Sequence, residues 1–107
     1  MSEFDKRREA FESKFAHEDG LRFKAIARRN RLMGLWAAQR LGKAGADAEA
    51  YASTVVIADF EEPGDDDVVR KVVSDLEAAG VSSDDGQVRR VLDKCMIRAV
   101  DEIKAGL

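Results

Sequence analysis

Apolar residues recur along this chain at spacings of three, four and seven, which is the pattern of helices that bury one face. Four segments show the pattern. They cover about 19–41, about 47–60, 65–79, and a last segment that Ser82 or Ser83 would cap and that runs to about Lys104. The β-branched run Val55-Val56-Ile57 lies inside this helical period, so strands are not expected. The sequence therefore predicts an all-α fold, a four-helix bundle.

Glycine, proline and aspartate mark where these helices are expected to begin and end. Gly42 follows the first apolar stripe and is expected to stop the first helix, and Asp47 is expected to cap the second by accepting a backbone N–H. Pro63-Gly64 then breaks the chain. Gly80, followed by the apolar Val81, suits a left-handed helix end onto which the next apolar residue packs back. The connections between helices are therefore predicted to be short.

The same periodicity predicts which side chains form the core. They are Ile26, Met33, Ala37 and Leu41 on the first helix, Tyr51, Val55 and Ala58 on the second, Val69, Val72, Val73, Leu76 and Ala79 on the third, and Val88, Val91, Leu92, Cys95, Ala99 and Ile103 on the fourth. Leu32, Leu35 and Trp36 widen the first stripe. We therefore assign Trp36 to the core rather than to a binding surface.

Residues 1–18 do not fit this bundle pattern. Phe4, Phe11 and Phe15 are spaced by seven and four, so they could share one helical face, while the rest of the segment is almost all charged or small. Such a segment buries little on its own, and an isolated helix of this length is marginal in water. We predict a flexible segment over 1–18, able to become helical against a partner, and a four-helix domain over 19–107. The phenylalanines are either anchors for a partner's groove or docked on the domain's own bundle.

Charge is distributed unevenly along the chain. The net charge of the 107 residues is −3, yet residues 19–43 hold seven Lys/Arg and one acid, a balance of 7 − 1 = +6, and residues 61–107 hold seven bases and twelve acids, a balance of −5. Two interpretations of Arg22, Arg28, Arg29 and Arg31 stay open: a solvated face paired with the acidic half, or a contact for an anion or a protein. Nucleic acid is not expected, because the net charge is negative and aromatic residues are not interleaved with the basic ones.

Catalytic chemistry is not expected either. The one histidine, His17, and the one cysteine, Cys95, are far apart in sequence, and Cys95 falls on an apolar stripe, where thiols are commonly inert. Four ligands for zinc are lacking. The acidic runs at 65–67 and 84–85 lack the spacing of a calcium loop but suit helix N-termini. We predict a protein that is not an enzyme, with no metal and no cofactor.

The location follows from segments that are missing from the sequence. The N-terminus has no apolar core of a secretory signal. No apolar run approaches the ~20 residues of a membrane helix. With a single cysteine no internal disulfide can form. We predict a cytoplasmic protein without direct membrane insertion.

Three motifs resemble a known family. FESKFAH (11–17), ARRNRLMGLWAA (27–38) and ADFEEPGDDDVVRKV (58–72) closely resemble the zeta subunit of alphaproteobacterial F-type ATP synthase, and the resemblance covers nearly the whole chain. It implies a four-helix regulatory protein that inhibits ATP hydrolysis by the catalytic head. It further implies that the N-terminal segment enters an interface between alpha and beta subunits and blocks rotation. The match is loosest over Met1–Ala10, the tip on which inhibition would depend.

The resemblance also implies partners and site residues. The partners are the alpha, beta and gamma subunits, reached by a protein that is a monomer when free and lies at the cytoplasmic face of the inner membrane when bound. The inhibitory contacts are expected from Phe4, Lys6, Arg7, Arg8, Phe11, Lys14 and Phe15. Some family members are also thought to bind adenine nucleotide. A small adenine-nucleotide-sensing or adaptor bundle, with weak binding at Arg22, Arg28, Arg29 and Arg31, is therefore the alternative function.

Overall fold

The computed structural model describes residues 19–59 and 65–106, which form four helices and no strand. The helices are α2 (Asp19–Arg40), α3 (Gly45–Ala58), α4 (Asp66–Ala78) and α5 (Asp85–Lys104). This confirms the all-α, four-helix prediction. The predicted N-terminal segment, with Phe4, Phe11, Phe15 and His17, lies outside the described residues.

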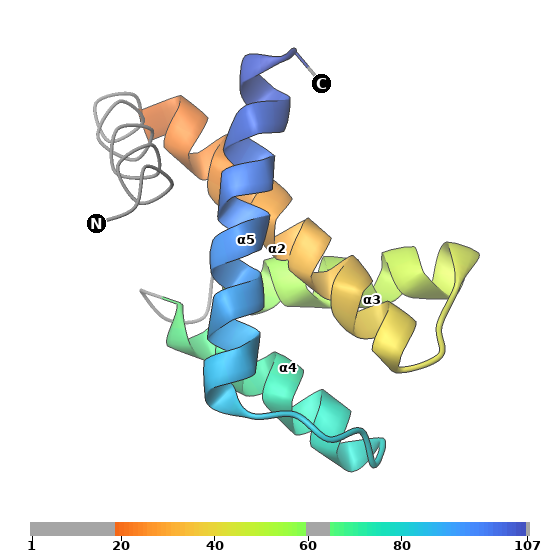
Figure 1. Cartoon of the computed structure of the whole chain (residues 1–107). Coiled ribbons are helices and arrows are strands. Elements are labelled where there is room, and N and C mark those ends of the chain that lie inside the picture. The colour runs from red at the N-terminus through yellow and green to blue at the C-terminus, as the bar shows by residue number, and fades with distance from the viewer. Residues whose placement is uncertain (1–18, 60–64, 107) are drawn as a thin grey trace.

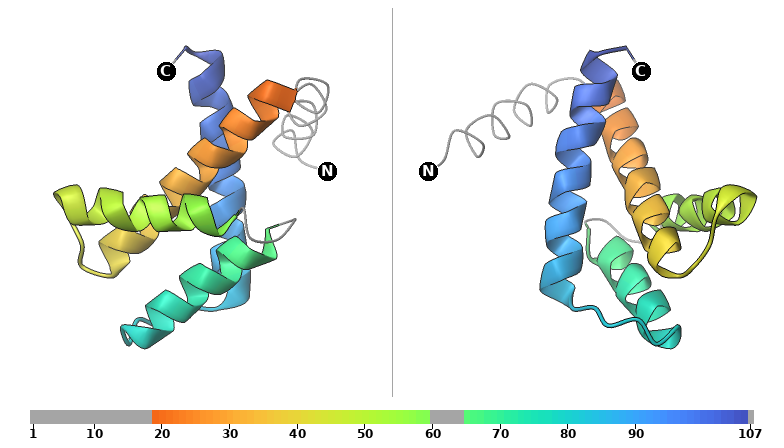
Figure 2. Two further views of the ribbon diagram at one scale, coloured as in Figure 1. Left: turned by 180° about the vertical axis from the view of Figure 1, so that it is seen from behind. Right: turned by 45° about the vertical axis from the view of Figure 1, so that its right-hand side comes forward.

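Helix α2 is the central element of the fold. It packs against α3, α4 and α5, and Figure 2 shows it between α5 on one side and α3 on the other. Figure 1 shows α2 and α5 crossing, with α4 lying beneath them and leading through a connection into the start of α5. Because α2 contacts every other helix, its two faces together determine how the bundle is assembled.

Two apolar clusters hold the helices together. The main cluster draws on all four of them: Met33, Ala37, Val55, Val68, Val69, Val72, Leu76, Val88 and Leu92. A smaller cluster joins Ala25 of α2 to Val100 of α5, with Leu21, Met96 and Ile103 around them. Burying a Val, Leu or Met side chain contributes about 1.5–3 kcal/mol. The main cluster therefore supplies most of the apolar stabilisation, and the smaller one fixes the first turns of α2 against the last turns of α5.

The two predicted glycine helix ends are present. Gly42 and Gly80 have positive φ angles of 78° and 75°, which glycine adopts without strain. After α4, the N–H of Gly80 donates to the carbonyl of Glu77 at 3.0 Å and the N–H of Val81 to that of Leu76 at 2.9 Å. Val81 then packs on the main cluster. These two bonds satisfy carbonyls that the helix end would otherwise leave without partners.

The predicted start of α3 was wrong by two residues. The helix begins at Gly45, with Ala44 as an extended N-cap residue that makes no side-chain cap bond, and it ends at Ala58 rather than near Phe60. Asp47 lies inside the first turn. There it faces the positive end of the helix dipole instead of capping a backbone N–H.

The predicted cap of α5 was also wrong. Neither Ser82 nor Ser83 caps the helix. Asp84 does, because its backbone is extended and its Oδ1 accepts the N–H of Gln87 at 2.7 Å. A carboxylate at this position accepts a free helical N–H, and its negative charge also interacts favourably with the positive end of the helix dipole. A serine hydroxyl is uncharged and interacts with the dipole more weakly.

Trp36 lies at the edge of the core. It is partly buried and packs on the main cluster, in agreement with its assignment to the core. Arg40 makes a cation–π contact with its ring, because the guanidinium carbon lies 4.5 Å from the ring centroid. Trp36 therefore contributes both to the core and to the surface above it.

Candidate functional site

A shallow basic depression lies where α2 meets the ends of α3 and α5. Its volume is about 810 Å³, and it is lined by Lys24, Ala27, Arg28, Arg31, Val56, Ile103 and Gly106. Lys24, Arg28 and Arg31 follow one another at i, i+4 and i+7, so they lie on one stripe of α2. The structure thus brings Arg28 and Arg31 of the predicted cluster together and adds Lys24, which the same spacing could have identified in the sequence.

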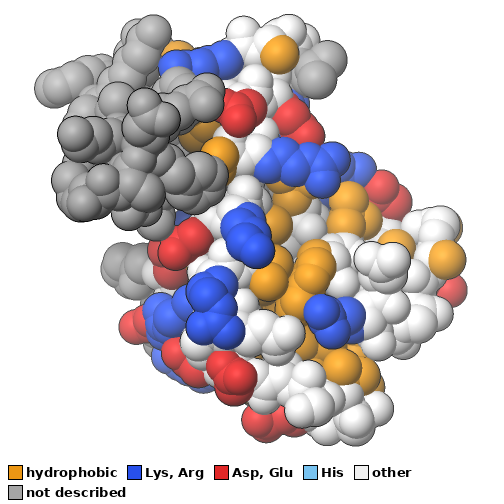
Figure 3. All heavy atoms as spheres, viewed as in Figure 1, with side chains coloured by type: hydrophobic (Ala, Val, Ile, Leu, Met, Phe, Trp, Pro, Cys, Tyr) orange, Lys and Arg blue, Asp and Glu red, His pale blue; other side chains and the backbone are white. Residues whose placement is uncertain are grey.

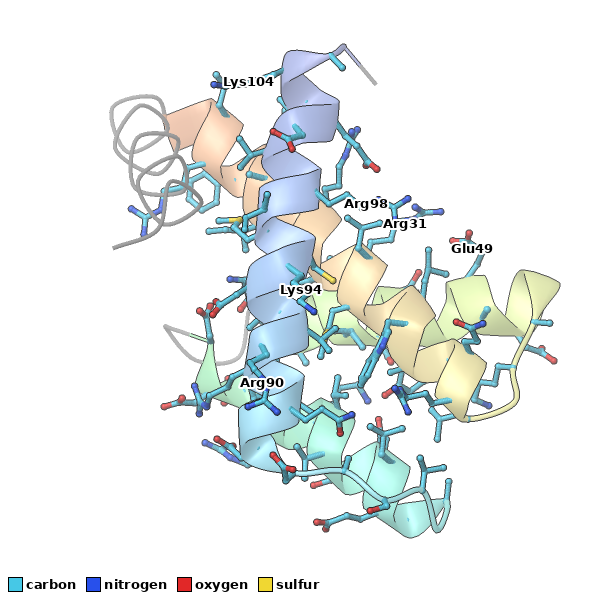
Figure 4. All side chains as sticks on the ribbon, in the orientation of Figure 1. Arg31, Glu49, Arg90, Lys94, Arg98 and Lys104 are labelled. Carbon is cyan, nitrogen blue, oxygen red and sulfur yellow. The ribbon has the colours of Figure 1, made fainter. Side chains whose placement is uncertain are left out.

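The two arginines of this depression are already paired with carboxylates. Arg28 lies 3.6 Å from Glu102 of α5, and Arg31 lies 2.7 Å from Glu49 of α3. Figure 4 shows the Arg31 and Glu49 side chains pointing toward one another across the two helices. Glu102 also accepts a bond from Arg98 at 2.9 Å. An anion that entered the depression would therefore have to compete with Glu49 and Glu102.

Arg29 faces a different part of the molecule. Its side chain is 6% exposed, and it reaches Asp65 at 2.9 Å and Asp59 at 3.9 Å. Its Nε also donates to Asn30 at 3.1 Å. Asp59 and Asp65 flank the chain segment between α3 and α4, so Arg29 ties both ends of that connection to α2. Arg29 does not line the depression, and it is engaged in holding the fold.

Arg22 is exposed on α2 but is not among the residues that line the depression. The four arginines of the predicted cluster therefore do not form a single surface. Figure 3 shows how basic and acidic side chains alternate over this face of the protein. An anion contact at the depression stays a prediction, carried by Lys24, Arg28 and Arg31.

The predicted inhibitory contacts lie outside the described residues: Phe4, Lys6, Arg7, Arg8, Phe11, Lys14 and Phe15. The described chain begins at α2, directly after them. Among the described residues, the exposed large apolar side chains are Phe23 at 69% and Ile57 at 61%. Phe23 therefore offers an exposed aromatic ring on the bundle itself, close in sequence to the predicted segment.

Other candidate chemistry is weak in the described part of the chain. Cys95 is half-buried, and burial raises the pKa of its thiol, which disfavours the reactive thiolate at neutral pH. Across residues 19–59 and 65–106 no three His, Cys, Asp or Glu side chains are grouped to hold a metal ion. None of the helices described here is long and apolar enough to span a membrane.

The comparisons with known proteins identify a family. The family model described as ATPase inhibitor subunit zeta matches residues 1–102. A protein with a solved solution NMR structure is 47% identical, with a TM-score of 0.72, over 81% of this chain and 99% of the other. The comparison with curated proteins gives no match. With a family match over almost its full length and the four-helix fold described above, this chain belongs to the family of ATPase inhibitor zeta subunits, a regulatory family.

Proposed function

We propose that this protein inhibits ATP hydrolysis by the catalytic head of an F-type ATP synthase, and that residues 1–18 insert at an interface between an alpha and a beta subunit. One observation carries the proposal: the zeta-family match begins at residue 1, so it includes the N-terminal segment as well as the helices. In this role the protein is cytoplasmic, monomeric when free, and held at the cytoplasmic face of the inner membrane when bound. It regulates the synthase and catalyses nothing itself.

The chemistry of the segment fits insertion into a protein groove. Phe4, Phe11 and Phe15 would act as apolar anchors, each contributing about 1.5–3 kcal/mol when fully buried. That contribution offsets the entropy lost when the segment becomes ordered. The bases Lys6, Arg7, Arg8 and Lys14 would set its orientation and register rather than its bulk affinity. The four-helix domain would act as a stop that limits how far the segment enters, and it would lie outside the interface.

Hydrolysis assays with the cognate catalytic head test this mechanism. The full chain is expected to lower the rate of ATP hydrolysis, and a version without residues 1–18 is expected to leave it unchanged. Phe11→Ala and Phe15→Ala should each raise the inhibition constant about tenfold or more, as loss of a buried aromatic anchor does. Both variants should keep the melting temperature of the parent. Equal inhibition by the full and the shortened chain would contradict insertion of the segment.

Phe23→Ala is the matched control. Phe23 is an exposed phenylalanine of the same chain, but it belongs to α2 and not to the segment. Its truncation removes the same amount of aromatic surface and should leave the inhibition constant unchanged. A rise in the inhibition constant as large as that of Phe15→Ala would show that the inserted part extends into α2.

A nucleotide-sensing bundle is the second candidate, and the basic depression favours it. Lys24, Arg28 and Arg31 place three cations beside Val56 and Ile103, a combination that suits a phosphate next to an apolar ring. Titration with ADP or ATP should then shift the amide signals of residues 24–31, and Lys24→Gln should reduce the shifts. Because Arg28 and Arg31 are paired with Glu102 and Glu49, binding should be weak. No shift at about millimolar ligand, the weak end of specific binding, would exclude this function.

A further inference from the structure

Many basic side chains of this domain pair with an acid. Ion pairs within the described part of the chain engage Arg28, Arg29, Arg31, Arg70, Lys71, Arg89 and Arg98. Arg90 and Lys94 differ. Both are exposed on α5, and neither makes an ion pair with any residue of the described part.

Arg90 and Lys94 lie on one stripe of α5. They are four residues apart, and Figure 4 shows them one above the other along the helix, followed by Arg98. Arg89, their neighbour in sequence, points elsewhere and binds Asp85 at 2.7 Å and Asp66 at 2.8 Å. Arg98 binds Glu102 at 2.9 Å, so the positive charge of this stripe that no ion pair within the described residues engages is that of Arg90 and Lys94.

Apolar side chains lie beside this stripe. Val91 and Cys95 of α5 and Trp36 of α2 are partly buried and pack on the main cluster, so part of each reaches the surface. Figure 3 shows an apolar area in the angle between α5, α2 and α4, with basic side chains around it. Arg40 lies over the Trp36 ring and has no ion pair among the described residues. We call the surface of Trp36, Arg40, Arg90, Val91 and Lys94 the α5 face.

The α5 face has the charge and polarity that complement an acidic amphipathic protein segment. The whole chain has a net charge of −3, so an excess of unpaired cations at one place is local and not a property of the overall composition. Carboxylates of a partner would reach Arg40, Arg90 and Lys94, and its apolar side chains would cover Trp36 and Val91. A membrane surface is a poorer fit, because the apolar residues of this face are partly buried instead of protruding into the acyl region.

We propose that the α5 face docks on an acidic amphipathic segment of the F-type catalytic head and holds the bundle there independently of residues 1–18. The identity of the partner rests on the proposed function. Docking through exposed cations speeds the encounter and makes it sensitive to salt. The protein would thus bind through two separate surfaces, an inhibitory segment and a charged face that brings the segment to its target.

Charge reversal in the full chain tests the α5 face. The probe is the purified cognate head, and the readout is the Kd at low salt and at about 0.15 M salt, where charges are screened beyond about 8 Å. Arg90→Glu combined with Lys94→Glu should raise the Kd at low salt about tenfold or more and flatten its dependence on salt. Lys43→Glu is the control for Lys94→Glu, because Lys43 is also an exposed lysine without an ion pair among the described residues. It should change the Kd by less than about twofold, and all variants should keep the melting temperature of the parent.

The outcomes separate this inference from the proposed function. The parent protein could bind the head with a Kd that depends on Arg90 and Lys94 and yet fail to inhibit ATP hydrolysis. That result would confirm docking through the α5 face and contradict inhibition by residues 1–18. If the parent inhibits and the double reversal behaves like Lys43→Glu, the α5 face is wrong. It is equally wrong if the head is not bound at all, or if the reversal weakens only binding to vesicles of phosphatidylglycerol and phosphatidylcholine in equal parts.

Discussion

Gly34 of α2 lies against Ala52 of α3 so closely that there is no room for a side chain between them. A Cβ built on Gly34 would lie 2.5 Å from Cα of Ala52 and 3.0 Å from its Cβ. Ala52 is itself 1% exposed. The two helix backbones are therefore in contact at this crossing. Glycine costs about 1 kcal/mol inside a helix relative to alanine, and the close approach of α3 is what offsets that cost here.

Gly34→Ala is expected to lower the free energy of unfolding by about 1–3 kcal/mol, because the backbones must separate to admit the methyl group. Gly20→Ala is the control. Gly20 also lies in α2, but a Cβ there meets nothing within 4 Å, so this change should be neutral or stabilising. Urea unfolding measures both. Similar free energies for the two variants would show that α2 and α3 are not in close contact at Gly34.

Arg29→Met is expected to destabilise the protein by about 1–3 kcal/mol, because it leaves Asp59 and Asp65 without their shared cation and removes a buried guanidinium from its partners. Arg31→Met provides the comparison. The Arg31–Glu49 pair is half exposed on both sides, so its loss should cost less than about 1 kcal/mol. Thermal and urea unfolding should show a larger decrease in stability for Arg29→Met than for Arg31→Met. The reverse ranking would show that Arg29 does not hold the α3–α4 connection.

Tyr51 is expected to make stability fall at alkaline pH. Burial, followed by its hydrogen bond to Asp75 at 2.8 Å and the negative charge of that carboxylate, raises the pKa of the Tyr51 phenol above the ordinary value of 10.0. The neutral phenol therefore stabilises the folded state fully below the pKa of the unfolded chain. This stabilisation is lost as the pH rises from about 10 toward the pKa of the folded state.

Two measurements check the role of Tyr51. It is the only tyrosine of the chain, so the phenolate absorbance titrates this residue alone, and its midpoint should lie above pH 10.0. Tyr51→Phe should cost about 0.5–1.5 kcal/mol at neutral pH, where Lys71 continues to bind Asp75. The difference between the variant and the parent should shrink as the pH is raised above about 10. A constant difference would mean that the phenol ionises equally well in the folded and unfolded chains.

Asp84→Ala is expected to cost about 1 kcal/mol through loss of the cap on α5. Ser82→Ala removes a nearby serine whose side chain makes no cap bond, and it should leave the free energy of unfolding nearly unchanged. Chemical unfolding of both variants decides which residue caps the helix. A larger decrease in the free energy of unfolding for Ser82→Ala than for Asp84→Ala would show that a serine caps α5, as the sequence pattern suggested.

Local signals in the sequence predicted most of the fold. The period of the apolar residues placed Met33, Ala37, Val55, Val72, Leu76, Val88 and Leu92 in the core, where they are buried. The ends at Gly42 and Gly80 were also predictable, because a left-handed glycine followed by its two hydrogen bonds depends on neighbouring residues alone. The caps were less predictable. The sequence pattern favoured Ser82 or Ser83, whereas the residue that follows them, Asp84, has the extended backbone and the side-chain bond of the cap.

The site was harder to predict than the fold. Arg28 and Arg29 are consecutive residues with the same side chain, so composition cannot tell that one lines a surface depression and the other is buried. That difference depends on where Asp59 and Asp65 lie after α3 and α4 have packed. Lys24 could have been grouped with Arg28 and Arg31 by spacing. The sequence could not predict that Arg90 and Lys94 make no ion pair within the described residues, because this depends on which acids the fold brings near them.

The central position of α2 has a mechanical consequence. The N-terminal segment precedes α2 in the chain, so a partner that holds the segment and pulls it along the axis of α2 would load this helix. Ala25, Met33 and Ala37 are spread along α2 and are buried against neighbouring helices. Their contacts would carry the load together, and contacts loaded in parallel resist a higher force than contacts broken one after another. A rotary enzyme that pulled on the segment would therefore act against the packing of almost the whole helix.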